Sequence, residues 1–172
     1  MNFSYVKAYR EADAIRALFL TVNEKGIPVD FRYTEKIKIE KIQKFMYGNM
    51  LDKYFKSDVL LEKYSKSIDF SVDFIFTVEE AFLESATFDD IVYMQETEDE
   101  PLEKAGSYIE LSPEYYLVQH SFSGNPIKMK FKEKKVLDKF INVIGENSEI
   151  KFSHEFYIFE PFYRLDKLHE VL

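Results

Sequence analysis

The chain has 172 residues, of which 46% are hydrophobic and 17% are aromatic, a composition typical of one compact globular domain. It contains no cysteine, which excludes disulfide bonds, thiolate zinc sites, iron–sulfur clusters and cysteine nucleophiles. No apolar run approaches the roughly 20 residues of a membrane span, and residues 1–13 lack the apolar stretch of a signal peptide. The sequence therefore predicts a cytoplasmic protein without membrane contact.

The net charge of −8 is distributed very unevenly along the chain. Residues 67–114 contain 14 acids and one lysine, whereas residues 36–66 contain eight lysines and four acids. An asymmetry of this kind bears on solubility and on the charge of binding partners, and does not by itself indicate a fold. The acidic stretch is the main functional signal in the sequence.

The first third of the chain predicts strands, followed by helix. Residues 3–9 form a plausible first strand, and apolar residues alternate over residues 27–34. Residues 15–22 form an apolar run that could be helix by composition, but we favour a strand because the short turn ending in Gly26 joins this run and the next into a hairpin. Pro28 has no backbone N–H, which favours an edge strand or the start of a strand.

Apolar residues spaced by three and four predict two helices over residues 38–66. Their core-facing stripe includes Ile42, Phe45 and Met46. We expect Ser57 and Asp58 to end one helix and cap the next, and Gly48 to mark close packing or a bend.

The rest of the chain predicts strands separated by helices. Residues 95–107 are acidic, contain one large aliphatic side chain, and are expected to form a mobile surface loop. The other expected elements are strands over residues 69–78, 91–94, 115–122, 126–132 and 152–159, a helical turn over 78–84, and helices over 134–144 and 161–172. This order predicts an α+β fold, a mainly antiparallel sheet with helices packed on it, in a single compact domain over residues 1–172.

One segment resembles a known family. The residues from Gly26 to Glu35, GIPVDFRYTE, followed by Met46-Tyr47-Gly48, resemble an uncharacterised bacterial family with a "G-x-P-(acidic)-F-R-x-T-E" strand and an "(apolar)-Y-G" helix. That family has no known activity, so the resemblance implies no functional residue. The same hairpin also looks like the opening of sensor and scaffold domains of the roadblock/profilin type.

A metal-dependent enzyme is one alternative function, with Asp73, His120 and His154 as candidate ligands. Asp69 and Asp73 share a strand face, but four residues along a strand span about 13 Å, too far for two ligands of one ion. No H-E-x-x-H spacing is present. We favour solvated acids and buried, hydrogen-bonded histidines, and hence no bound metal or cofactor.

Nucleic-acid binding is a second alternative, through Lys41, Lys44 and Lys53 of the basic segment. The net charge of −8 disfavours it. No phosphate-binding glycine loop or hydrolase elbow occurs in the sequence. Asp30 and Arg32 face the same way and are expected to form a surface ion pair, with a substrate carboxylate site as the alternative.

The preferred interpretation is a small interaction or assembly protein that is not an enzyme and forms a homo-oligomer. The expected partner-binding residues are Glu96, Glu98, Asp99 and Glu100, in the acidic loop. Their partner is either a second copy, whose basic helix complements the acidic stretch, or a basic surface of another protein.

Overall fold

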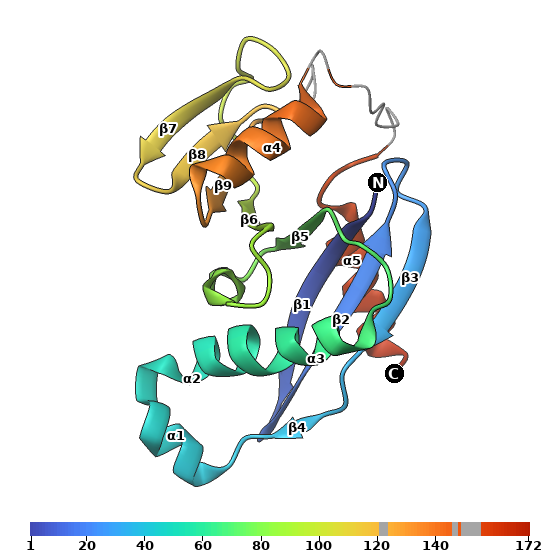
Figure 1. Cartoon of the computed structure of the whole chain (residues 1–172), viewed down its shortest axis with the longest axis vertical. Coiled ribbons are helices and arrows are strands. Elements are labelled where there is room, and N and C mark those ends of the chain that lie inside the picture. Colours follow the sequence, from blue (N-terminus) through green and yellow to red (C-terminus); the bar gives the residue numbers. More distant parts are fainter. Residues whose placement is uncertain (121–123, 146–147, 149–155) are drawn as a thin grey trace.

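The computed structural model describes residues 1–120, 124–145, 148 and 156–172. Nine strands of these residues form one mixed sheet in the order β3-β2-β1-β5-β6-β9-β8-β7, and the short β4 pairs with β2 (Figure 1). The strands are β1 (Phe3–Glu11), β2 (Ala14–Val22), β3 (Pro28–Tyr33), β4 (Ile37–Lys38), β5 (Phe74–Thr77), β6 (Ile91–Gln95), β7 (Tyr108–Ser112), β8 (Tyr115–Val118) and β9 (Ile127–Phe131).

The sheet is mostly antiparallel, as the sequence predicts, but its centre is parallel. Strand β5 runs parallel to β1 on one side and to β6 on the other, whereas the remaining pairs are antiparallel. Parallel neighbours need a crossover connection, which the helical segment between β4 and β5 provides. The coarse α+β class is therefore confirmed.

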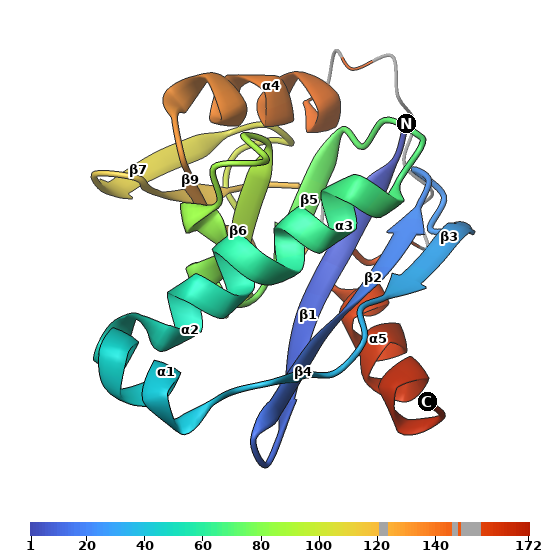
Figure 2. The same cartoon turned by 60° about the horizontal axis from the view of Figure 1, so that its bottom comes forward.

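Helices cover both faces of this sheet, as the two views show (Figures 1 and 2). A bent helical segment covers one face, and α4 and α5 lie against the other. The helical elements are α1 (Lys41–Tyr47), the 3-10 turn η1 (Gly48–Met50), α2 (Leu51–Lys53), the π-helical η2 (Tyr54–Leu60), α3 (Leu61–Ser67), the 3-10 turn η3 (Glu80–Glu84), α4 (Lys134–Ile144) and α5 (Glu160–Glu170). No helix in the described part of the chain has the length and apolar character needed to span a bilayer.

Alternating side chains of the central strands divide the core into two layers. Phe74 and Phe76 of β5 pack toward α4 and α5, whereas Ile75 packs toward the bent helical segment. All four residues of β5 are buried. A strand buried on both faces loses the apolar–polar alternation of a half-exposed strand.

Several predicted boundaries are wrong. Strand β5 begins at Phe74, so residues 69–73 lie outside it. The helical break lies at Gly48, which has a φ of 51°, and Ser57 lies inside η2. A Cβ at Gly48 would meet nothing within 4 Å, so this glycine marks a bend and not close packing.

The C-terminal half shows both confirmed and revised elements. The predicted helices over α4 and α5 and the β8–β9 hairpin are confirmed. Strand β7 was not predicted, because all five of its residues are exposed and its pattern lacks a buried face. Residues 156–159 do not form the last strand that the sequence predicts, and residues 152–155 lie outside the described part.

A buried network of three hydroxyl groups joins the helical segment to the sheet. Ser4 Oγ lies 2.6 Å from Thr21 Oγ1 and 2.7 Å from the hydroxyl oxygen of Tyr64 on α3. The Tyr64 ring stacks on Phe19 of β2 with centroids 3.8 Å apart. These contacts fix where α3 crosses β1 and β2.

We expect Tyr64→Phe to lower the free energy of unfolding by about 1–3 kcal/mol, because it removes the buried hydrogen bonds of the Tyr64 hydroxyl to Ser4 and Thr21, which retain the bond to each other. Urea denaturation measures this loss. Tyr33→Phe is the matched control, since the Tyr33 ring is exposed. Equal stability of the two variants would show that the network does not hold α3.

Candidate functional site

The acidic loop predicted as a partner-binding element lies between β6 and β7 and forms neither helix nor strand (Figure 1). Hydrogen bonds attach it to the residues that flank β8 and β9. Thr97 donates to the backbone oxygen of Pro126, and the Leu102 N–H donates to Gln119 Oε1 at 2.9 Å. The Gly106 N–H donates to the backbone oxygen of Gln119 at 2.8 Å, and the Gln119 N–H donates to the backbone oxygen of Ser107 at 2.9 Å. The mobility of residues 95–107 stays a prediction.

The four predicted acids are not equivalent. Glu96 accepts a hydrogen bond at 2.9 Å from the hydroxyl of Tyr163 on α5. Burial and the Glu96 carboxylate together raise the pKa of Tyr157. Glu98, Asp99 and Glu100 are exposed and form no ion pair within the part of the chain that the structure describes. Glu96 therefore ties the loop to α5, and the other three acids face solvent.

The loop leads directly into β7, the last strand of the sheet. Among the described residues, β7 pairs with β8 alone, and no strand of this part of the chain lies along the N–H and C=O groups of its outer side. Its side chains Tyr108, Ile109 and Leu111 are exposed. We define the acidic edge as β7 together with four acids of the preceding loop: Glu98, Asp99, Glu100 and Glu103.

A second place of interest is the point where the chain changes direction across the sheet. Strands β1 and β5 are neighbours, but β1 is followed by β2 on one side of this pair and β5 is followed by β6 on the other. Open sheets bind ligands at the carboxyl ends of strands where the order reverses in this way. There, Glu79 Oε2 accepts a hydrogen bond from the Ala8 N–H at 2.8 Å. Lys56 Nζ lies 3.1 Å from Glu79 Oε1 and 3.0 Å from Asp52 Oδ2.

The Lys56 ammonium group thus lies between two carboxylates. Burial lowers the pKa of Lys56, but Glu79 and Asp52 outweigh it, so the pKa lies above its ordinary value. The lysine is therefore charged at neutral pH and offsets the charge of both acids. Carboxylates are the ligands that hard cations prefer, and here they already have a cationic partner.

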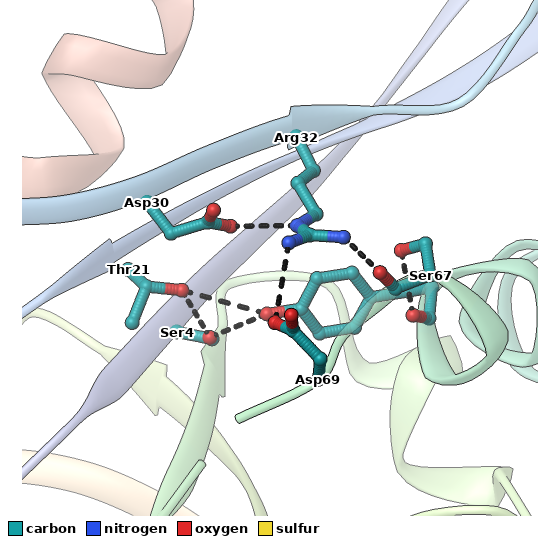
Figure 3. Close-up of polar contacts among 7 residues, drawn as sticks. Ser4, Thr21, Asp30, Arg32, Ser67 and Asp69 are labelled. Atoms are coloured by element: carbon teal, nitrogen blue, oxygen red, sulfur yellow. Dashed lines mark hydrogen bonds and ion pairs between the residues drawn. The ribbon is translucent and has the colours of Figure 1, made fainter. Parts of the chain in front are cut away.

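Asp30 and Arg32 form the predicted pair, with Arg32 Nε 2.9 Å from Asp30 Oδ2 (Figure 3). The same guanidinium group donates to the backbone oxygen of Ser67 and lies 3.8 Å from Asp69 Oδ1. It also covers the ring of Phe70. Arg32 therefore fastens the end of α3 to β3, and its donors are directed at groups of the chain itself.

The candidate metal ligands do not assemble in the described residues. Asp73 Oδ2 accepts a hydrogen bond from the Asn2 N–H at 2.8 Å. His120 is buried just after β8, and burial lowers its pKa to about 4. His154 lies outside the described residues. Among residues 1–120, 124–145, 148 and 156–172, no three His, Asp or Glu side chains are placed to hold a metal ion.

The basic segment is largely neutralised by its own surroundings. Lys44 lies 2.6 Å from Asp13, and Lys53 lies 3.5 Å from Glu84. Of the eight lysines in residues 36–66, only Lys41 has no ion pair within the described chain. The three lysines proposed for nucleic-acid binding therefore do not form a free cationic surface.

One surface was missed because its residues were assigned to the core. Ile42, Phe45, Met46 and Met50 are 58% to 78% exposed, although their spacing is that of a core-facing stripe. The bend at Gly48 turns α1 away from the sheet, so the stripe loses the surface it would cover. The glycine at position 48 could have indicated a bend, but the sequence alone does not show in which direction the chain turns there.

Comparisons with known proteins identify the fold alone. No protein-family model and no curated protein matches the chain. The crystal structure of endonuclease V from Bacillus subtilis matches with a TM-score of 0.54 and 7% identity, over 99% of this chain and 80% of that chain. Argonaute from Marinitoga piezophila, in complex with 5′ OH guide RNA, matches with a TM-score of 0.37 and 13% identity, over 80% of this chain and 25% of that chain. The chain thus shares its fold with endonuclease V.

We expect Lys56→Met to lower the free energy of unfolding by about 1–3 kcal/mol, because Glu79 and Asp52 lose their cationic partner. Urea denaturation of Lys56→Met, Glu79→Gln and the double variant gives the coupling between the two groups. The free energy of unfolding of the double variant should fall by less than the sum of the decreases in the two single variants. Lys66→Met, which breaks the exposed pair with Glu62, is the control; strict additivity would refute the coupling.

His120 should make stability depend on pH. Its folded pKa of about 4 lies below the unfolded value near 6.5, so the unfolded chain binds more protons between these pH values. The free energy of unfolding should therefore fall as the pH drops from 6.5 toward 4. The melting temperature of His120→Phe should change less between pH 7 and pH 5 than that of the unchanged protein. An equal change in both proteins would assign the pH dependence to other groups.

Proposed function

We propose that the protein is a non-catalytic interaction module that binds an extended, basic segment of a partner at the acidic edge. The observation that carries this proposal is the combination of an open strand edge with adjacent exposed acids. All five residues of β7 are exposed, and Glu98, Asp99, Glu100 and Glu103 lie in the loop that precedes the strand.

The chemistry of the edge defines the partner. The outer backbone groups of β7 can pair with an added strand, which supplies affinity without regard to sequence. Ile109 and Leu111 offer apolar contacts, and the acids favour lysine or arginine in the partner and speed its encounter. A basic, apolar, extended segment meets all three requirements.

The opposite edge of the sheet is less suited to strand addition. Strand β3 starts with Pro28, which has no N–H to donate. Arg164 of α5 donates to the backbone oxygen of Gly26 at 2.9 Å, just before this strand. These contacts favour β7 as the binding edge.

The arrangement at Lys56 supports a binding role over catalysis. Many nucleases use two metal ions held by carboxylates. In this chain, the carboxylates nearest the change of direction in the sheet, Glu79 and Asp52, have Lys56 as their partner. A metal-dependent reaction at Asp73, His120 and His154 stays a separate prediction.

Nucleic-acid binding is the second candidate, and the fold shared with endonuclease V favours it. It would use Lys41, Lys44 and Lys53, of which the last two already pair with acids. Binding of this kind would weaken steeply with added salt because of counterion release.

Fluorescence anisotropy tests the primary proposal with a labelled peptide of alternating lysine and valine. We expect the protein to bind it at low salt, and Glu98→Gln/Asp99→Asn/Glu100→Gln/Glu110→Gln to weaken binding about tenfold or more. The matched control makes the same charge change elsewhere on the surface: Glu35→Gln/Asp58→Asn/Glu62→Gln/Glu170→Gln.

A peptide with proline at alternate positions should bind much more weakly, because it cannot pair along β7. Equal binding by the edge and control variants would remove the proposal. If the protein instead bound labelled single-stranded DNA, and added salt abolished that binding, the second candidate would be favoured.

A further inference from the structure

The α1 projection is an exposed apolar feature that the proposed function does not use. It consists of α1 and η1, and neither element has a buried residue. Ile42, Phe45 and Met46 are exposed at helical spacing on α1, and Met50 is exposed just after the bend at Gly48. Both views show α1 standing away from the sheet at the end of the bent helical segment (Figures 1 and 2). A concentrated apolar stripe of this kind marks a contact surface.

We propose that the α1 projection of one copy packs on the acidic edge of a second copy, and that two such contacts close a two-fold dimer. This inference goes beyond the proposed function, because it assigns to the same edge a helical occupant that packs on side chains and adds no strand. The apolar stripe lies on Ile109 and Leu111 of the second copy, beside its acids.

Charge selects this pairing over the alternatives. Residues 41–50 contain no acid; Lys44 pairs with Asp13, and Lys41 has no ion pair among the described residues. Within the same part of the chain, the acids of the acidic edge have no ion pair either. Two acidic edges repel each other, and pairing β7 with β7 of a second copy brings the two Glu110 side chains close together. Two α1 projections also repel through Lys41. The projection and the edge attract.

The positions of the two surfaces allow closure. Both figures place α1 and β7 on the left side of the molecule, with α1 below β7. A two-fold axis across that side brings each α1 opposite the β7 of the other copy. One short helix covers less than the roughly 800 Å² per partner of a stable interface, so both contacts are needed.

Sedimentation equilibrium of the full chain tests the dimer. We expect the unchanged protein to dimerise, and both Phe45→Ser/Met46→Ser and Glu98→Lys/Glu100→Lys/Glu110→Lys to weaken dimerisation at least tenfold. The substituted side chains are exposed, so folding should be retained, and circular dichroism checks this. Val171→Ser/Leu172→Ser removes two other exposed apolar side chains and should leave the dimer unchanged.

Mixing the two variants gives the decisive result. A mixed dimer keeps one intact contact, between the α1 projection of the edge variant and the acidic edge of the projection variant, whereas a dimer of either variant alone keeps none. A mixture should therefore associate more tightly than either variant alone and more weakly than the unchanged protein. A monomeric unchanged protein, a projection variant that dimerises as tightly as the unchanged protein, or a mixture that associates no more tightly than either variant alone would each overturn the inference.

The lysine–valine peptide separates this inference from the proposed function. The projection variant should bind the peptide as well as the unchanged protein does, because its acidic edge is intact, and the peptide should dissociate the dimer. A monomer that binds the peptide would overturn the dimer and retain the proposed function. A dimer in which the edge never binds the peptide would overturn the proposed function.

Discussion

The burial of β5 on both faces is the constraint on which the rest of the structure depends. This strand pairs in parallel with β1 and β6, and parallel pairing requires connections that cross over the sheet. The crossover from β4 to β5 is the bent helical segment, which covers one face, while α4 and α5 cover the other. Phe74, Ile75 and Phe76 thereby contribute to two separate apolar layers.

Because both faces of the sheet are covered, the surfaces left for partners lie at its periphery. Strand β7 ends the sheet that the described residues form, and α1 extends past the sheet on the far side of the bend at Gly48. One surface is acidic and offers backbone groups, and the other is apolar and carries Lys41, together with Lys44, which pairs with Asp13. This separation of charge and shape underlies both proposals about partners.

At the change of direction between β1 and β5, polar side chains of the chain bind one another. Glu79 binds the backbone of β1 and the Lys56 ammonium group, and Asp52 supplies a second carboxylate. The three side chains connect η2, α2 and the end of β5. Their ion pairs hold the helical segment against the sheet at the place where related architectures bind ligands.

Local patterns in the sequence determined the hairpin strands, the helix over α4 and the concentration of acids before β7. These features depend on neighbours within a few residues, and short-range periodicity and turn chemistry are sufficient to identify them. Of the candidate site, the sequence located Glu98, Asp99 and Glu100 by charge alone and correctly paired Asp30 with Arg32.

Only the tertiary structure decided which apolar residues are buried and which edge is open. Phe45 and Phe55 have the same helical spacing, yet the first is exposed and the second is buried, because Gly48 redirects the chain between them. The open edge at β7 and the Lys56 cluster both follow from strand order. Strand order is set by contacts between residues far apart in the sequence, which local periodicity does not encode.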